Sequence, residues 1–164
     1  MLTPLLMLVL LVTPWALSRV VPAWRSRGPA AAAAGAGLLF LFTSSGHFLQ
    51  AGPMAEMLPP WVPYRAELVL LTGFLEIAVG LGFFWHRTRQ LSAWLAAAML
   101  VLFFPANVYA AFNQVPMGGH AWGPVYLLVR APVQLAILAW LWIFWLRQGV
   151  PSRRLHGFGP RAFR

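Results

Sequence analysis

Five long apolar segments constrain what this chain can fold into more than any other feature of its sequence. They cover residues 2–18, 30–49, 66–85, 91–112 and 122–146. Each is close to the roughly 20 residues with which an α-helix crosses the hydrocarbon core of a bilayer. Only 9% of all residues are charged, against about a quarter in soluble domains. We therefore predict an all-α, polytopic transmembrane helical bundle that lies in a lipid bilayer.

The first segment has two possible identities, a cleaved signal peptide or a retained transmembrane helix. Ala16-Leu17-Ser18 is similar to a signal cleavage site. However, the segment lacks a basic stretch before its apolar part and contains Pro4 and Pro14. We favour a retained span, which makes the N-terminus an additional helix.

Arginine residues predict the orientation of the spans. Ten of the twelve arginines lie on one predicted side, in the first loop, the third loop and the C-terminal tail. The other two are Arg65 and Arg130. Because positively charged loops stay in the cytoplasm, we predict an outside N-terminus and a cytoplasmic C-terminus. The net charge of +9 gives no reason to expect a nucleic-acid partner, since the arginines flank apolar runs instead of lining a polar face.

We divide the chain into three parts on this basis. Residues 1–29 form the additional helix and a basic cytoplasmic loop, residues 30–146 form a four-helix membrane core, and residues 147–164 form a basic tail. Such a tail is expected to lie against anionic lipid headgroups. The chain contains no Cys, which excludes thiol chemistry and thiolate metal sites. His86 and His156 are predicted to be cytoplasmic, so only His120 shares the predicted side of His47, and no metal site is predicted.

Two charged residues lie deep inside predicted spans, where each is energetically unfavourable. Glu76 and Arg130 lie about 15 Å and about 12 Å below the outer ends of their spans, at about 1.5 Å per residue. Similar depths on different helices predict a buried ion pair, direct or bridged by water. Two alternatives stay open: a protonated Glu76 bonded to backbone, and an Arg130 side chain that reaches toward the outer surface.

Further polar side chains lie at similar depth. Asn107 follows Pro105, which is expected to kink its helix, Gln134 lies one turn after Arg130, and His47 is near the outer end of its span. These residues predict a polar pocket that opens outward. Each also has a purely structural interpretation: an ion pair that sets helix register, an amide that satisfies a kink, a histidine that bonds loop backbone.

Small residues accompany the buried carboxylate on the third apolar segment. Gly73 and Gly80 lie on the same helical face as Glu76. In membrane helices, small residues let a neighbouring helix approach closely. We therefore expect another helix to pack directly beside Glu76.

Four short stretches occur in order on four successive segments. They are Ser45-Gly46-His47-Phe48, Leu71-Thr72-Gly73-Phe74-Leu75-Glu76, Phe104-Pro105-Ala106-Asn107 and Arg130-Ala131-Pro132-Val133-Gln134. As an ordered set they resemble the DoxX family of small bacterial membrane proteins, over roughly residues 35–146. The resemblance implies a four-helix core in the bacterial inner membrane. It also implies a ligand-binding role for the five matching positions, His47, Glu76, Asn107, Arg130 and Gln134.

The family resemblance also suggests a function. The family takes its name from a membrane subunit of a thiosulfate:quinone oxidoreductase, so we expect a redox-associated subunit that binds a quinone or another amphipathic small molecule, or a lipid. Electrons would come from a protein partner. The alternative is a non-catalytic assembly or scaffold protein with a structural Glu–Arg pair; a transporter is less favoured, because the spans contain no inverted repeat. Enzymatic turnover and homo-oligomerisation are left open.

Two features depart from the family pattern. The first span is additional, which suggests a peripheral helix or a surface for a partner. The glycine directly precedes His47, where the family more often has it further upstream, so the local helix packing is not predicted.

Overall fold

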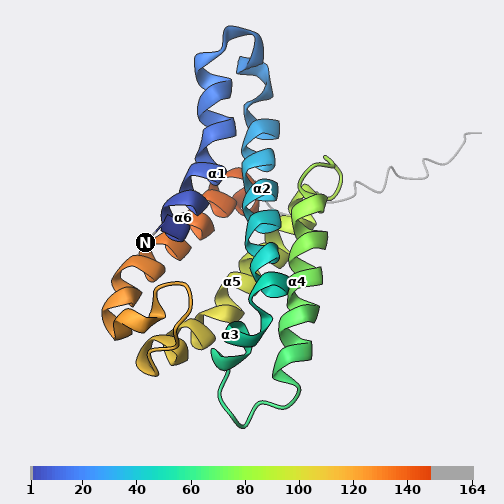
Figure 1. Cartoon of the computed structure of the whole chain (residues 1–164). Helices are drawn as coiled ribbons and strands as arrows, with labels where there is room; N and C mark the ends of the chain where they lie inside the picture. The colour runs from blue at the N-terminus through green and yellow to red at the C-terminus, as the bar shows by residue number, and fades with distance from the viewer. Residues whose placement is uncertain (1, 149–164) are drawn as a thin grey trace, which may run out of the picture.

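The structure is a computed structural model of the whole chain, and it describes residues 2–148 (Figure 1). The predicted basic tail lies outside the described residues from position 149 onward. The regular elements are α1 (Leu2–Val20), η1 (Pro22–Arg27), α2 (Gly28–Leu49), α3 (Ala51–Glu56), α4 (Arg65–Gly82), α5 (Arg89–Phe112), η2 (His120–Tyr126), α6 (Leu127–Phe144) and η3 (Leu146–Gln148). Within residues 2–148 every regular element is a helix, which confirms the all-α prediction.

Four helical segments are long and apolar enough to cross a membrane. They are Leu2–Val20, Pro22–Leu49, Arg89–Phe112 and His120–Phe144. Four such segments are compatible with a multi-pass membrane protein. The remaining long helix, α4, has 18 residues but contains Arg65, Glu67 and Glu76. It runs antiparallel beside α2 (Figure 1), and its assignment as a fifth span stays a prediction.

The last predicted span is broken near its start. Gly118 and Gly119 adopt positive φ angles of 60° and 105°, which residues other than glycine rarely adopt, and they form a turn. The chain then makes the 3₁₀ helix η2, in which Gly123 has φ 74° and ψ −160°. Because of this break, α6 itself begins only at Leu127.

The N-terminal helix is an integral part of the bundle. A Cβ atom at Gly35 in α2 would overlap the carbonyl oxygen of Leu11 in α1, so the two backbones touch. Leu11 is 1% exposed, and Trp15 packs edge-on against Trp140 of α6 with ring centroids 5.8 Å apart. The expectation of a peripheral helix is therefore wrong: glycine in α2 lets α1 dock as closely as any helix of the core.

Glycines also close the contact between α2 and α4. A Cβ at Gly73 would lie 2.6 Å from Cβ of His47, and one at Gly80 would lie 3.2 Å from the carbonyl oxygen of Gly37. This arrangement confirms the close helix approach expected beside Glu76. It places the side chains of His47 and Glu76 on facing helices.

The two halves of the bundle have different interiors. The half that contains the α1–α2 and α4–α5 turns holds a continuous apolar core, in which Leu11, Phe40, Phe83, Ile137 and Leu141 are almost fully buried. The other half holds the polar side chains of α2, α4, α5 and α6 around a cavity. The cavity therefore rests on a tightly packed base.

Candidate functional site

A cavity of about 560 Å³ lies between the helices. All five predicted site residues line it: His47, Glu76, Asn107, Arg130 and Gln134. Its volume falls within the roughly 300–1,000 Å³ range of small-molecule sites. The structure thus brings the five residues together; whether they bind a ligand stays a prediction.

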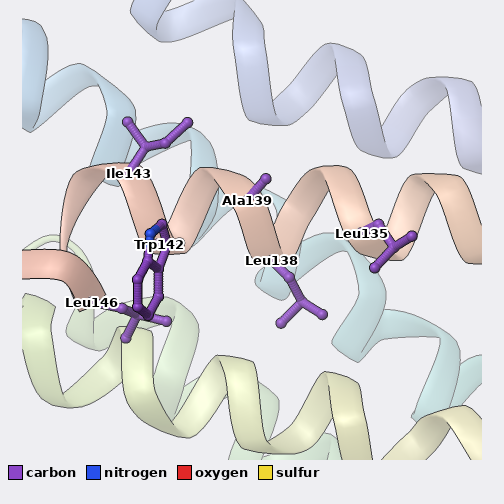
Figure 2. Close-up of a pocket in the computed structure, with 6 residues that line it drawn as sticks. All are labelled: Leu135, Leu138, Ala139, Trp142, Ile143 and Leu146. Carbon is purple, nitrogen blue, oxygen red and sulfur yellow. The ribbon is translucent and has the colours of Figure 1, made fainter.

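A second pocket, of about 530 Å³, lies on one face of α6 and η3 (Figure 2). Its lining consists of Leu135, Leu138, Ala139, Trp142, Ile143 and Leu146. Leu135 and Trp142 are more than half exposed, and the lining is apolar apart from the indole nitrogen. Such a face suits lipid acyl chains and offers no acid–base chemistry.

The carboxylate of Glu76 is bound by α2. The hydroxyl of Thr43 donates to Oε2 of Glu76 at 2.8 Å, and Nε2 of His47 lies 3.5 Å from Oε1. On its other side, Nδ1 of His47 lies 2.8 Å from the carbonyl oxygen of Val69 and 3.1 Å from the hydroxyl of Thr72. The carbonyl can only accept, so Nδ1 carries a proton.

The charge of the His47–Glu76 pair depends on the ring of His47. With the proton of Nδ1 assigned, Nε2 faces a carboxylate oxygen at 3.5 Å. A second proton on the ring makes this contact an ion pair with a net charge of zero.

The predicted direct ion pair between Glu76 and Arg130 is wrong. Within residues 2–148, the ion pair of Glu76 is with His47. The reason lies in helix adjacency: α4 packs against α2 and α5, whereas α6 packs against α5, η2 and α1. Equal depth in the bilayer brought both charges to the same cavity but did not make their helices direct neighbours.

Arg130 is positioned by an amide and a thioether. Its Nε donates to Oδ1 of Asn107 at 3.1 Å, and Nη1 lies 3.7 Å from Sδ of Met7, a weak acceptor. Its Nη2 has no partner among the described residues. Within residues 2–148, the side-chain nitrogens that are buried and have no hydrogen-bond partner are Nε1 of Trp15 and Nε2 of His120. Nη2 of Arg130 has no partner but is not one of these buried nitrogens, so it is accessible.

The two amide side chains join α5 to its surroundings near Pro105. Asn107 donates through Nδ2 to the carbonyl of Phe103 at 2.8 Å. Gln134 donates through Nε2 to the carbonyl of Leu100 at 3.0 Å. Both amides therefore have structural partners as well as a position on the cavity wall.

Sequence reasoning missed several lining residues near the predicted ones. Thr43 lies one turn before His47 on α2, and Thr72 one turn before Glu76 on α4, so helical spacing could have found both. Met7 of α1 gave no signal, because an apolar residue in an apolar helix is unremarkable.

His120 and Tyr126 were missed as well. They lie on η2 with ring centroids 4.9 Å apart, and both line the cavity. Nδ1 of His120 lies 2.8 Å from the carbonyl of Met117, so Nδ1 carries the proton. Tyr126 is 2% exposed and lies four residues before Arg130, on the same helical face.

The described part of the chain contains no group of three His, Asp or Glu side chains arranged to hold a metal ion. The cavity wall presents one imidazole–carboxylate pair, one guanidinium and several neutral donors and acceptors. It can hold an oxygen-bearing group and exchange a proton with it.

Comparison with known proteins places the chain in a family. Neither a curated protein nor a solved structure shows significant similarity to it. A family model described as "Domain of unknown function (DUF8561)" matches residues 35–145. The match begins inside α2 and includes the five predicted site residues, while α1, which supplies Met7, precedes it. The chain therefore belongs to the DUF8561 family of domains of unknown function.

Proposed function

We propose that this protein is a small bacterial inner-membrane protein of the DoxX type that binds a quinone or another amphipathic small molecule in the cavity. The observation that carries the proposal is the accessible guanidinium of Arg130, which has no counter-ion within residues 2–148. An unpaired charge inside a membrane protein is unfavourable, and such residues mark functional sites more often than structural ones. A bound oxygen atom would give the guanidinium its partner.

The cavity wall offers a matching environment for the rest of such a molecule. Phe42, Met57, Leu58 and Phe103 line it together with the polar groups. Sites of this mixed character bury an apolar body and orient it by a few polar contacts. A protonated His47–Glu76 pair would be able to give a proton to a bound oxygen that gains negative charge.

The redox association and the orientation belong to the same proposal. Support for a redox complex comes from the resemblance in four stretches, and a soluble partner would supply the electrons. An outside N-terminus is supported by the arginine-bearing turns, since η1 and the α4–α5 turn lie toward the same end of the bundle (Figure 1). The cavity would then open toward the outer surface.

A binding assay tests the proposal. The full chain in phosphatidylcholine nanodiscs is expected to retain a small molecule detectable by native mass spectrometry, and to gain thermal stability with a short-chain quinone. Arg130→Gln is expected to abolish both effects, while Arg25→Gln, at an exposed position in η1, is expected to leave them unchanged. No retained molecule and no quinone-dependent shift would contradict the proposal.

One observation favours the second candidate, a non-catalytic assembly or scaffold protein. Most polar side chains of the cavity bond to other helices: His47 to α4, Arg130 to α5, and Gln134 to α5. Such hydrogen bonds between helices stabilise a bundle without a ligand. In this candidate the structural pair is His47–Glu76. Cavity variants that still fold would then keep the cellular function of the wild-type protein, even where they abolish ligand binding.

A further inference from the structure

The cavity contains a guanidinium without a direct ionic partner. Of the side chains that line it, those of Asp, Glu, Lys and Arg type are Glu76 and Arg130. Glu76 has its ionic partner in His47, whose Nε2 lies 3.5 Å from Oε1. Arg130 has no such partner among the side chains of the lining.

The free edge of the guanidinium is also preorganised. Its Nε edge is occupied by Asn107, which is itself held by the carbonyl of Phe103. The terminal edge, formed by Nη1 and Nη2, has one weak contact, with the sulfur of Met7. A planar guanidinium binds a carboxylate through two parallel N–H···O bonds, so this edge is matched to a planar, two-oxygen head group.

Tyr126 adds a neutral donor to the same cavity. It lies four residues before Arg130, about one helical turn away. No hydrogen bond engages its hydroxyl within residues 2–148. Arg130 and Tyr126 therefore both offer donors to a molecule in this cavity.

Charge decides between head groups. A neutral carbonyl, such as that of a quinone, would accept a hydrogen bond without compensating the charge, so it would bind more weakly than a carboxylate. A phosphate monoester has a charge of about −1.5 to −2 near neutral pH and would exceed the single positive charge. A carboxylate neutralises it one for one.

We infer that the molecule bound in the cavity is an amphiphile with a carboxylate head group, held by Arg130 and Tyr126, whose hydrocarbon tail lies along the apolar wall. This inference rests on the proposed function, that the cavity binds an amphiphile, and specifies its head group. It predicts that single-chain carboxylates bind better than alcohols or phosphates of equal length.

Photolabelling of the full chain in phosphatidylcholine nanodiscs tests the inference. The probes are diazirine-bearing hexadecanoic acid, hexadecanol and hexadecyl phosphate, with the labelled peptides mapped by mass spectrometry. We expect the acid to label lining peptides at least about tenfold more efficiently than the alcohol, since hydrogen bonds to charged groups contribute about 1.5–3 kcal/mol. Arg130→Gln should remove this preference, Tyr126→Phe should reduce it, and Arg25→Gln should retain it.

The outcomes separate the inference from the proposed function. Equal labelling of the cavity by acid and alcohol, or stronger labelling by the phosphate, would overturn the carboxylate head group while the binding of an amphiphile stands. No cavity labelling by any probe would overturn both. The comparison of acid with alcohol uses the unaltered protein, so it decides the question even where a variant does not fold.

Discussion

The surroundings of Glu76 and Arg130 differ, although both residues line the same cavity. Glu76 is 6% exposed and has Thr43 and His47 as partners. Arg130 has one strong hydrogen bond, to Asn107, and a terminal nitrogen without a partner in the described part of the chain. A charge that the fold satisfies belongs to the architecture, whereas a charge that it leaves accessible and unpaired is available to a ligand.

Helix packing is the origin of this difference. Gly73 brings α2 into contact with α4, so the carboxylate meets side chains across a closed helix–helix contact. Arg130 projects from α6 into the space between α1, α5 and η2, where the opposing groups are a thioether, an amide and aromatic rings. Variants that change the surroundings of Glu76 and leave those of Arg130 intact, or the reverse, test this difference.

The largest effect is expected for Glu76→Ala. It removes the carboxylate that accepts from Thr43 and faces Nε2 of His47, and breaking a buried pair lowers the free energy of unfolding by about 3–5 kcal/mol. Glu76→Gln, which can still bond both partners, should lose about 1 kcal/mol. Reversible unfolding in mixed micelles measures both, with Glu67→Ala at an exposed position as the control. An equal loss for Ala and Gln would show that the hydrogen bonds contribute nothing.

A double-mutant cycle is expected to give the next largest value. Because His47 and Glu76 are in contact, replacing both by apolar residues should give an interaction energy of about 1–3 kcal/mol. The same cycle for Glu76 and Arg130 should give less than about 0.5 kcal/mol, since they share no direct bond. The opposite order of the two energies would restore the ion pair that the structure lacks.

Gly73→Ala tests the contact that holds the Glu76 side together. The added Cβ would lie 2.6 Å from Cβ of His47, and overpacking of this kind lowers stability by about 1–3 kcal/mol. Gly52→Ala is the matched control, because a Cβ there has no neighbour within 4 Å. A loss of similar size in both variants would mean that the α2–α4 distance does not matter.

The smallest effect on stability is expected for Arg130→Met. Removing a charge without a counter-ion should change the free energy of unfolding by about 1 kcal/mol or less, and in the stabilising direction where the sign is resolved. The measurement is the same unfolding assay, with no added ligand. A loss comparable to that of Glu76→Ala would show that Arg130 is part of the architecture after all.

Much of the fold was predictable from local patterns in the sequence. Apolar runs of membrane-spanning length predicted all five long helices, with ends within a few residues of those observed apart from the late start of α6. Gly118 and Gly119 predicted the turn before η2. The short helix α3 was not predicted, because its six residues, including Gly52 and Pro53, have no helical apolar pattern.

Five residues that line the cavity were predictable, but their hydrogen bonds and ion pairs were not. Polar residues are unfavourable in apolar helices unless they gather, so His47, Glu76, Asn107, Arg130 and Gln134 could be grouped by depth alone. Depth contains no information on which helices are neighbours. The partner of Glu76 and the role of Met7 therefore required the packed structure.

By itself, the sequence determined that this chain forms long apolar helices and that a few polar groups lie at one level among them, because both follow from the spacing of residues along a helix. Only the tertiary structure decided that α1 contributes Met7 to the cavity wall, that His47 is the ionic partner of Glu76, and that Arg130 is left with an open edge. These outcomes depend on how closely two helices approach, and that distance is decided by the side chains of both helices together.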